Sequence, residues 1–221
     1  MGVDCKAIRY APSRGRAGEP VRILTVGRLV EKKGTEYSLR ALAEVVREAP
    51  HVDWRFEVVG DGPLGDGLRE LAGRLALDDR VRFLGPLPSD EVRERLAAAD
   101  LFLLPSVVAS DGDMEGIPVS LMEAMAAGVP VVSSVHSGIP ELIDHGASGL
   151  LAEERDVAGL VRHVRTLIEN PDARRRLVGP ARRKVEQEFN QDLIHARLVD
   201  SIHATVGTER VPTSDQEHTR A

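Results

Sequence analysis

The sequence is poor in residues that several classes of protein require. Its 221 residues include a single cysteine, Cys5, which excludes an internal disulfide and a thiolate metal site and fits a reducing compartment. Aromatic residues make up only 3%, too few for the stacking platforms that bind single-stranded nucleic acid or polysaccharide. No apolar run approaches the roughly 20 residues of a membrane span, and the polar start differs from a signal peptide. We therefore expect a cytoplasmic protein.

Positive charge is not in excess either. Lys and Arg number 29 against 35 Asp and Glu, a formal net charge of −6. This balance argues against a general binder of nucleic acid or of anionic membranes. Apolar residues at 42% and charged residues at 29% indicate a folded domain, and the length is sufficient for one substantial core.

Short apolar runs alternate with amphipathic helical segments along most of the chain. Each run is nearly continuously apolar, which is typical of a strand buried on both faces of a parallel sheet. Alternation of strand and helix predicts a Rossmann-like α/β domain of three layers. The predicted strands are Val21–Val26, Trp54–Val59, Val81–Leu84, Leu101–Leu104, Val131–Ser133 and Gly149–Leu151.

The remaining segments define the predicted boundaries. Residues 1–19, which end in a polar stretch rich in Gly and Pro, are interpreted as a lead-in or linker, residues 20–206 as the domain, and residues 207–221 as a disordered tail. Helices are expected at 157–169 and 180–189. A following amphipathic stretch carries Ile194, Leu198 and Ile202 on one side, and this stripe either lacks its usual partner or packs on the domain's own core.

Two cations follow the first predicted strand. Arg28 and Lys33 lie in the segment from Gly27 to Gly34, just before a helix. In an open parallel sheet, ligands bind where strands end and loops turn into helices. Cations, free amides and a helix N-terminus together favour an anion there. The alternative is a pair of solvated side chains, with Gly34 relaxing the turn.

Two acids follow the fourth predicted strand. Glu115 lies in the loop before a helix that starts near Pro118, and Glu123 lies about one turn inside that helix. Eight helical residues rise about 12 Å, comparable to a nucleoside diphosphate that carries a sugar. Carboxylates repel a diphosphate but accept hydrogen bonds from neighbouring hydroxyls. The alternative is a pair of acids that simply favour the helix N-terminus.

Four motifs in this order resemble the nucleotide-sugar-binding domain of family 4 retaining glycosyltransferases, which have the GT-B fold. The similarity runs from about residue 2 to residue 151, with a family-like helical tail to about residue 206. Within the family, the sequence around Glu115 is most similar to that of enzymes of colanic-acid and exopolysaccharide assembly. The motifs are Gly27-Arg28…Lys33-Gly34, Val58-Val-Gly-Asp-Gly-Pro63, Glu115-x7-Glu123 and Gly138-Ile-Pro-Glu141.

The resemblance implies a role for each matching position. Arg28 and Lys33 would hold the donor diphosphate, and with Glu115 they are the catalytic candidates. Glu123 would bind the ribose hydroxyls, and Glu115 would contact the donor sugar. The amides near the phosphates would be those of Gly116, Ile117 and Val119. The base would lie against the backbone near Gly85 and Leu87.

The resemblance also implies a reaction and partners. The donor would be a UDP-, GDP- or ADP-sugar, and the hexosyl group would pass with retention to a glycan or lipid-linked acceptor in polysaccharide biosynthesis. No cofactor and no metal would be needed. The family's N-terminal acceptor domain is missing, so we expect the isolated chain to be inactive. Contact with the inner membrane through the acceptor lipid stays open, as do a donor-binding module without turnover and a nucleotide-sugar epimerase.

Several other patterns favour less specific interpretations. The segment from Gly60 to Gly65 satisfies the dinucleotide fingerprint, but a structural turn is favoured because no acid follows the next strand. Asp111 and Asp113 form a D-x-D pattern, for which a flexible acidic loop is favoured over a metal site. Of seven histidines, only His136 falls near the expected cleft, and a surface position is favoured for it. Glu141 is either a helix-capping acid or a substrate ligand.

Overall fold

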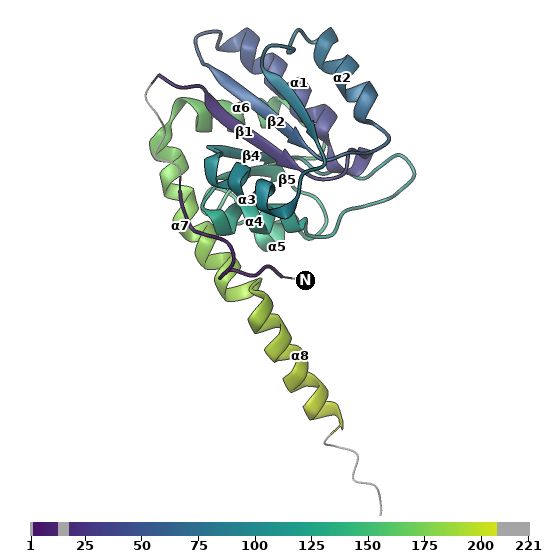
Figure 1. The fold of residues 1–221 in the computed structure, drawn as a ribbon, viewed down its shortest axis with the longest axis vertical. Helices are drawn as coiled ribbons and strands as arrows, with labels where there is room; N and C mark the ends of the chain where they lie inside the picture. Colours follow the sequence, from purple (N-terminus) through teal and green to yellow (C-terminus); the bar gives the residue numbers. More distant parts are fainter. Residues whose placement is uncertain (1, 13–17, 207–221) are drawn as a thin grey trace, which may run out of the picture.

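Six parallel strands form one sheet in the order β3-β2-β1-β4-β5-β6, in a computed structural model that describes residues 2–12 and 18–206 (Figure 1). All six predicted apolar runs are strands, and the Rossmann-like α/β prediction is confirmed. β3 and β5 extend one residue beyond the predicted runs, and β6 begins and ends one residue later. The bounds are β1 Val21–Val26, β2 Trp54–Val59, β3 Val81–Gly85, β4 Leu101–Leu104, β5 Val131–Ser134 and β6 Leu150–Ala152.

Helices cover both faces of this sheet because its strands are apolar on both faces. On β1, Ile23 joins the core formed with α1, α2 and α6, whereas its neighbour Leu24 joins the core formed with α3, α4 and α5. The bounds of these helices are α1 Thr35–Glu48, α2 Gly65–Arg74, α3 Ser89–Ala98, α4 Val119–Ala127, α5 Ile139–Leu142 and α6 Val157–Glu169.

The order of the strands reverses between β1 and β4. β1 pairs with β2 on one side, and Ile23 and Leu24 pair with Leu101 and Phe102 of β4 on the other. Beyond β1 the sheet grows toward β3, and beyond β4 it grows toward β6. In doubly wound sheets, ligands bind outside the carboxyl ends of the strands at this point of reversal. The fold therefore favours a ligand site at the loops after β1 and β4.

The prediction of a helix at 180–189 is wrong about where the helix begins. α7 spans Pro171–Glu188 and contains Pro180 in its interior. Its N-cap is Asn170, whose side chain accepts a hydrogen bond from the Ala173 amide, and Pro171 occupies a first-turn position that proline tolerates. Ala181 and Val185 pack into the core, which holds the helix together across the proline.

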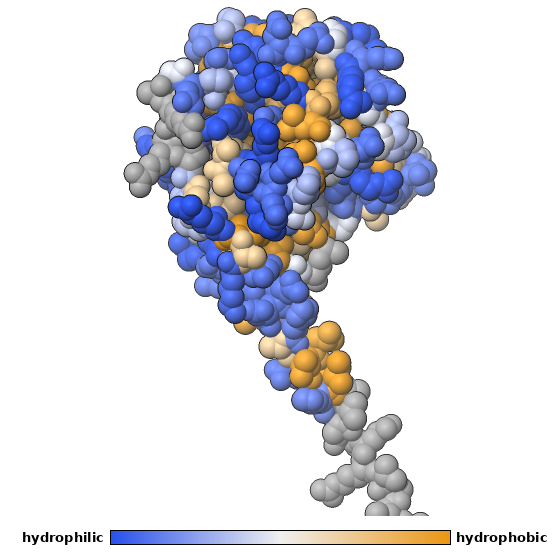
Figure 2. Space-filling view, viewed as in Figure 1, coloured by the Kyte–Doolittle hydropathy of each residue, from blue (hydrophilic) through white to orange (hydrophobic). Residues whose placement is uncertain are grey.

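The last described helix, α8 (Gln191–Val206), extends away from the domain (Figure 1). Ile194 packs against Gly2, whereas Leu198 and Ile202 are 58% and 50% exposed, so only the first residue of the predicted stripe touches the domain. Figure 2 shows the exposed apolar side chains as a patch on this helix. No helix of the described residues is both long and apolar enough to cross a membrane.

The N-terminal segment lies against the domain where it is described. Val3 forms a parallel bridge with Asn190, and the guanidinium of Arg182 donates hydrogen bonds to the carbonyls of Cys5 and Ile8. Residues 13–17 of the predicted linker and the predicted tail at 207–221 lie outside the described residues.

Candidate functional site

The loops after β1 and β4 touch each other at the carboxyl edge of the sheet. The loop after β1 contains a short 3₁₀ helix, η1 (Glu31–Lys33), and ends at Gly34 with a φ of 66°. A Cβ at residue 34 would lie 1.8 Å from the carbonyl oxygen of Pro105, so only glycine allows this approach. The amide of Val107 also donates a hydrogen bond to the carbonyl of Lys32. The two predicted site segments are therefore neighbours in space.

Lys33 and Glu115 form an ion pair between these loops. The Nζ atom of Lys33 lies 2.7 Å from Oε2 of Glu115, and their side chains are 14% and 17% exposed. The side chain of Lys33 passes over Gly27 at the end of β1. One predicted cation and one predicted acid, 82 residues apart in sequence, thus meet at the edge of β1, and limited solvent access strengthens their attraction.

The two loops that carry this pair also carry other positively polarised groups. Arg28 is exposed, and its guanidinium forms no hydrogen bond or ion pair with any residue that the structure describes. Within the same described ranges, no protein group accepts a hydrogen bond from the amides of Gly116, Ile117 and Val119, which lead into α4. A guanidinium and helix N-terminal amides that are unpaired among the described residues, on two loops that meet at this edge, are the kinds of groups that bind an anion.

Glu123 lies in a pocket of a different character. The carboxylate makes no hydrogen bond or ion pair within the described part of the chain, and burial raises its pKa, although the charge of Arg93 partly offsets the effect. The pocket has a volume of about 240 Å³. Its lining is mostly apolar and consists of Ile8, Val26, Leu87, Ser89, Val92, Arg93, Leu96 and Glu123. A carboxylate held in this way has lone pairs available for hydroxyl groups of a ligand.

The pocket and the ion pair adjoin each other at the end of β1. Val26 lines the pocket, and the next residue, Gly27, lies beneath the Lys33 side chain. Consecutive Cα atoms are about 3.8 Å apart, so both sites border the end of β1. Of the two residues predicted near a base, Leu87 lines the pocket. Gly85 lies at the end of β3, where its carbonyl accepts a hydrogen bond from the amide of Gly60.

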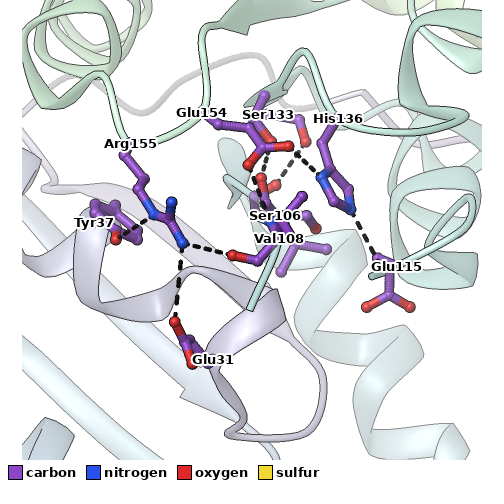
Figure 3. A network of polar contacts seen from close by, with 11 residues as sticks. Glu31, Tyr37, Ser106, Val108, Glu115, Ser133, His136, Glu154 and Arg155 are labelled. Atoms are coloured by element: carbon purple, nitrogen blue, oxygen red, sulfur yellow. Dashed lines mark hydrogen bonds and ion pairs between the residues drawn. The ribbon is translucent and has the colours of Figure 1, made fainter. Parts of the chain in front are cut away.

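The surface position favoured for His136 is wrong. Its side chain is fully buried and points toward Glu115 and the loop that carries it (Figure 3). The Nε2 atom accepts a hydrogen bond of 3.1 Å from the Glu115 amide, and Nδ1 lies 2.5 Å from Oε1 of Glu154. Glu154, in the loop after β6, is a site neighbour that the sequence reasoning missed.

Glu154 connects two points of the loop after β4. Its Oε2 accepts a hydrogen bond of 2.9 Å from the Val108 amide, and the guanidinium of Arg155 donates one of 2.6 Å to the Val108 carbonyl (Figure 3). Burial alone would raise the pKa of Glu154, but the hydrogen bonds from His136 and from Val108 outweigh it, so the pKa is lowered. The carboxylate is therefore ionised at neutral pH.

Two other sequence patterns have structural explanations in this region. A Cβ at residue 60 would lie 1.9 Å from the Gly27 carbonyl oxygen, so backbone packing accounts for this glycine of the dinucleotide-like segment. In the D-x-D pattern, both carboxylate oxygens of Asp113 lie 3.0 Å from Nζ of Lys32, and the Asp111 carboxylate accepts a hydrogen bond from the Asp113 amide. The acidic loop is thus fastened to η1 rather than free.

Comparison with known proteins adds the following. Residues 9–184 match the protein family described as Glycosyl transferases group 1. The putative colanic acid biosynthesis glycosyltransferase WcaL of Escherichia coli K12 is 42% identical over 205 residues, which are 92% of this chain and 50% of that protein. The amylovoran biosynthesis glycosyltransferase AmsK of Erwinia amylovora is 44% identical over 182 residues, 82% of this chain and 44% of that protein. This chain spans about half the length of these relatives.

A solved structure gives the same picture of the fold. The structure of Anabaena Alr3699/HepE in complex with UDP and glucose has a TM-score of 0.77 and 26% sequence identity. The similarity covers 92% of this chain and 55% of that chain.

Proposed function

The chain belongs to the group 1 glycosyl transferases, and we propose that it is the donor-binding domain of a retaining hexosyltransferase. The donor is a nucleoside-diphosphate sugar, and the acceptor is a glycan or a lipid-linked sugar in exopolysaccharide assembly. The acceptor-binding half belongs to the portion of the relatives that this chain does not match. The observation that supports the proposal most is that the Lys33–Glu115 ion pair and the Glu123 carboxylate, which has no partner among the described residues, both lie at the edge where β1 and β4 end.

Each part of the donor has a chemically suitable neighbour. The diphosphate is bound by Arg28, by Lys33 and by the amides before α4, all of which are donors or cations. The ribose hydroxyls donate to Glu123, since a half-buried carboxylate with no partner among the described residues gains from such hydrogen bonds. The base lies against the apolar wall at Leu87. Glu115 then faces the sugar while it keeps its contact with Lys33.

The reaction exchanges one bond at the anomeric carbon. The bond from this carbon to the diphosphate oxygen breaks, and its electron pair stays on the diphosphate. An acceptor hydroxyl oxygen bonds to the carbon on the same face, which retains the configuration, and its proton passes to the departing diphosphate oxygen. Negative charge on the diphosphate therefore grows in the transition state. Arg28 and Lys33 stabilise that charge, so they lower the barrier in addition to binding the donor. In this proposal these cations, and not a metal, neutralise the leaving group.

Calorimetric titration of UDP, GDP and ADP into the 221-residue chain tests donor binding. We expect one nucleoside diphosphate to bind at least about tenfold more tightly than the others, a difference of about 1.4 kcal/mol. A folded chain that binds none of the three at millimolar concentration would contradict the proposal. The HepE complex with UDP makes UDP the first ligand to test.

Product analysis distinguishes the alternatives that the sequence left open. Membership in a transferase family favours transfer over epimerisation. Mass spectrometry after incubation with the matching nucleotide sugar would show an epimerised donor if the chain were an epimerase. Binding without any product would identify a donor-binding module that needs its acceptor half. Transfer to an acceptor by the protein that contains both halves is the expected result.

A further inference from the structure

His136 is buried and Glu154 is partly exposed, and both contact the loop that presents Glu115. The loop between β4 and α4 is long, and its middle, from Ser110 to Met114, is exposed. At its end, the Glu115 amide donates a hydrogen bond to Nε2 of His136. Neither His136 nor Glu154 faces the donor in the arrangement proposed above, so their role is separate from donor contact.

The hydrogen bonds determine which nitrogen of His136 carries the proton. The Glu115 amide is a donor, so Nε2 must be the unprotonated acceptor. The proton is then on Nδ1, which donates to the carboxylate of Glu154 at 2.5 Å. A single carboxylate thus fixes the tautomer that the Glu115 amide requires.

The same carboxylate also holds the beginning of the loop. Its second oxygen accepts the Val108 amide, while the first acts on Glu115 through His136. A further contact lies just past Glu115, where the side chain of Ile117 packs against Gly138, 2.8 Å from the position that a Cβ would occupy. The two ends of the loop are therefore anchored to the segments that follow β5 and β6 (Figure 3).

We propose that His136, oriented by Glu154, is a positioning residue that holds the backbone of Glu115 so that its carboxylate faces Lys33 and the donor sugar. This inference rests on the proposed function for the identity of the donor, but its geometry does not. Without these hydrogen bonds, the loop would have to lose conformational entropy each time a donor binds. Misplacement of a reacting group by about 1 Å can also cost about 100-fold in rate.

Two substitutions of His136 separate its hydrogen bonds. His136→Asn places an amide near the Nδ1 position, so it keeps a donor to Glu154 but removes the acceptor for the Glu115 amide. His136→Gln places an amide oxygen near the Nε2 position, so it keeps the acceptor. For the protein that contains both halves, we expect the asparagine variant to lose about 10- to 100-fold in kcat and the glutamine variant to recover most of that loss. The affinity for the nucleoside diphosphate alone stays within about threefold in both, because its ligands are unchanged.

Glu154→Gln tests the tautomer without changing any atom that touches Glu115. Its amide oxygen must either accept the Val108 amide or face His136, and the amide NH₂ group then faces the other partner. If the oxygen stays on Val108, the NH₂ donates to Nδ1 and moves the histidine proton to Nε2, against the Glu115 amide. If it turns, Val108 loses its acceptor. We expect a fall in kcat similar to that of His136→Asn.

Nitrogen-15 NMR of the His136 ring in the 221-residue chain measures the tautomer directly. A proton on Nδ1 in the wild type, moved to Nε2 or exchanging between the two in Glu154→Gln, is the expected result. Amide hydrogen exchange at Glu115 should accelerate in His136→Asn and not in His136→Gln.

Two results would each overturn the inference: a proton on Nε2 of His136 in the wild type, or an unchanged kcat in His136→Asn. A third would be that the asparagine variant and the glutamine variant lose the same amount of kcat and the same amount of thermal stability. A failed donor titration would contradict the proposed function instead, and the NMR and exchange measurements would still test the positioning.

Discussion

Glu115 and Glu123 are the same residue type on one short segment, yet their surroundings are opposite. Glu115 forms an ion pair with Lys33, and its amide is held by His136. Glu123 has no bonding partner within the described residues, and burial in a mostly apolar pocket raises its pKa. One acid is therefore placed before any ligand arrives, whereas the other has hydrogen-bonding capacity that no described residue uses. The comparison indicates that Glu115 serves a step that needs fixed geometry, and Glu123 serves binding.

The strongest test of this difference removes the charge that pairs with Glu115. In the protein that contains both halves, Lys33→Ala should lower turnover by on the order of 100-fold or more, because a cation at the departing diphosphate and the partner of Glu115 are lost together. Arg28→Ala should also lose on the order of 100-fold, through the diphosphate alone. Steady-state kinetics on purified, folded variants would show both.

Lys32→Ala is the matched control for this experiment. Lys32 is the same residue type on the same 3₁₀ helix, but its Nζ contacts Asp113. Turnover within about threefold of the wild type is expected for this control. A loss of under threefold in Lys33→Ala would remove the assigned role of Lys33 and, with it, the distinction between the two acids.

A smaller effect is expected when the other acid is changed. Glu123→Leu should weaken nucleoside diphosphate binding by about 10- to 100-fold, since hydrogen bonds to a charged group contribute about 1.5–3 kcal/mol. kcat at saturating donor should change far less. Titration of the same chain with a 2′,3′-dideoxynucleoside diphosphate supplies the control, because this ligand lacks the hydroxyls that Glu123 would accept.

The two ligands and two proteins form a double-mutant cycle. If Glu123 binds the ribose, the dideoxy ligand should bind the wild type and Glu123→Leu with nearly equal affinity. Equal weakening of both ligands would show that Glu123 contacts some other part of the donor.

The carboxyl edge of the sheet could be predicted because its signals are local. Short apolar runs such as Val21–Val26 and Leu101–Leu104 are read as buried strands from consecutive residues. Parallel strands bring their following loops to one edge, so Lys33 and Glu115 were expected in one region although 82 residues separate them. The structure adds that they touch, which depends on the approach of Gly34 to Pro105.

The support beneath Glu115 could not be predicted in the same way. His136 follows a buried strand in a polar segment, and Ser137 after it has a φ of 46°, so no periodic pattern shows which side chain turns inward. Its partner Glu154 lies in another loop, and pairings between loops leave no spacing signal. The one available signal was that the loop after β5 begins at the same edge of the sheet as the site. The start of α7 was missed for a different reason: Pro180 suggested a boundary, but core packing by Ala181 and Val185 overrides the proline.

The smallest expected effect is on the stability of the ligand-free chain, and here the two acids should act with opposite signs. Burial raises the folded-state pKa of Glu123 above the ordinary value of 4.5. The stability that the folded chain gains from protonation of Glu123 is therefore complete below pH 4.5, and it is lost as the pH rises through the folded-state pKa. At pH 7, Glu123→Gln should thus raise Tm, and the gain should vanish near pH 4. Glu115→Gln should lower Tm at pH 7, because Lys33 loses its partner. Changes of about 1 kcal/mol would appear as roughly 2–4 °C in calorimetric melts. Shifts of the same sign at pH 7 would show that both acids share one kind of environment, contrary to the comparison.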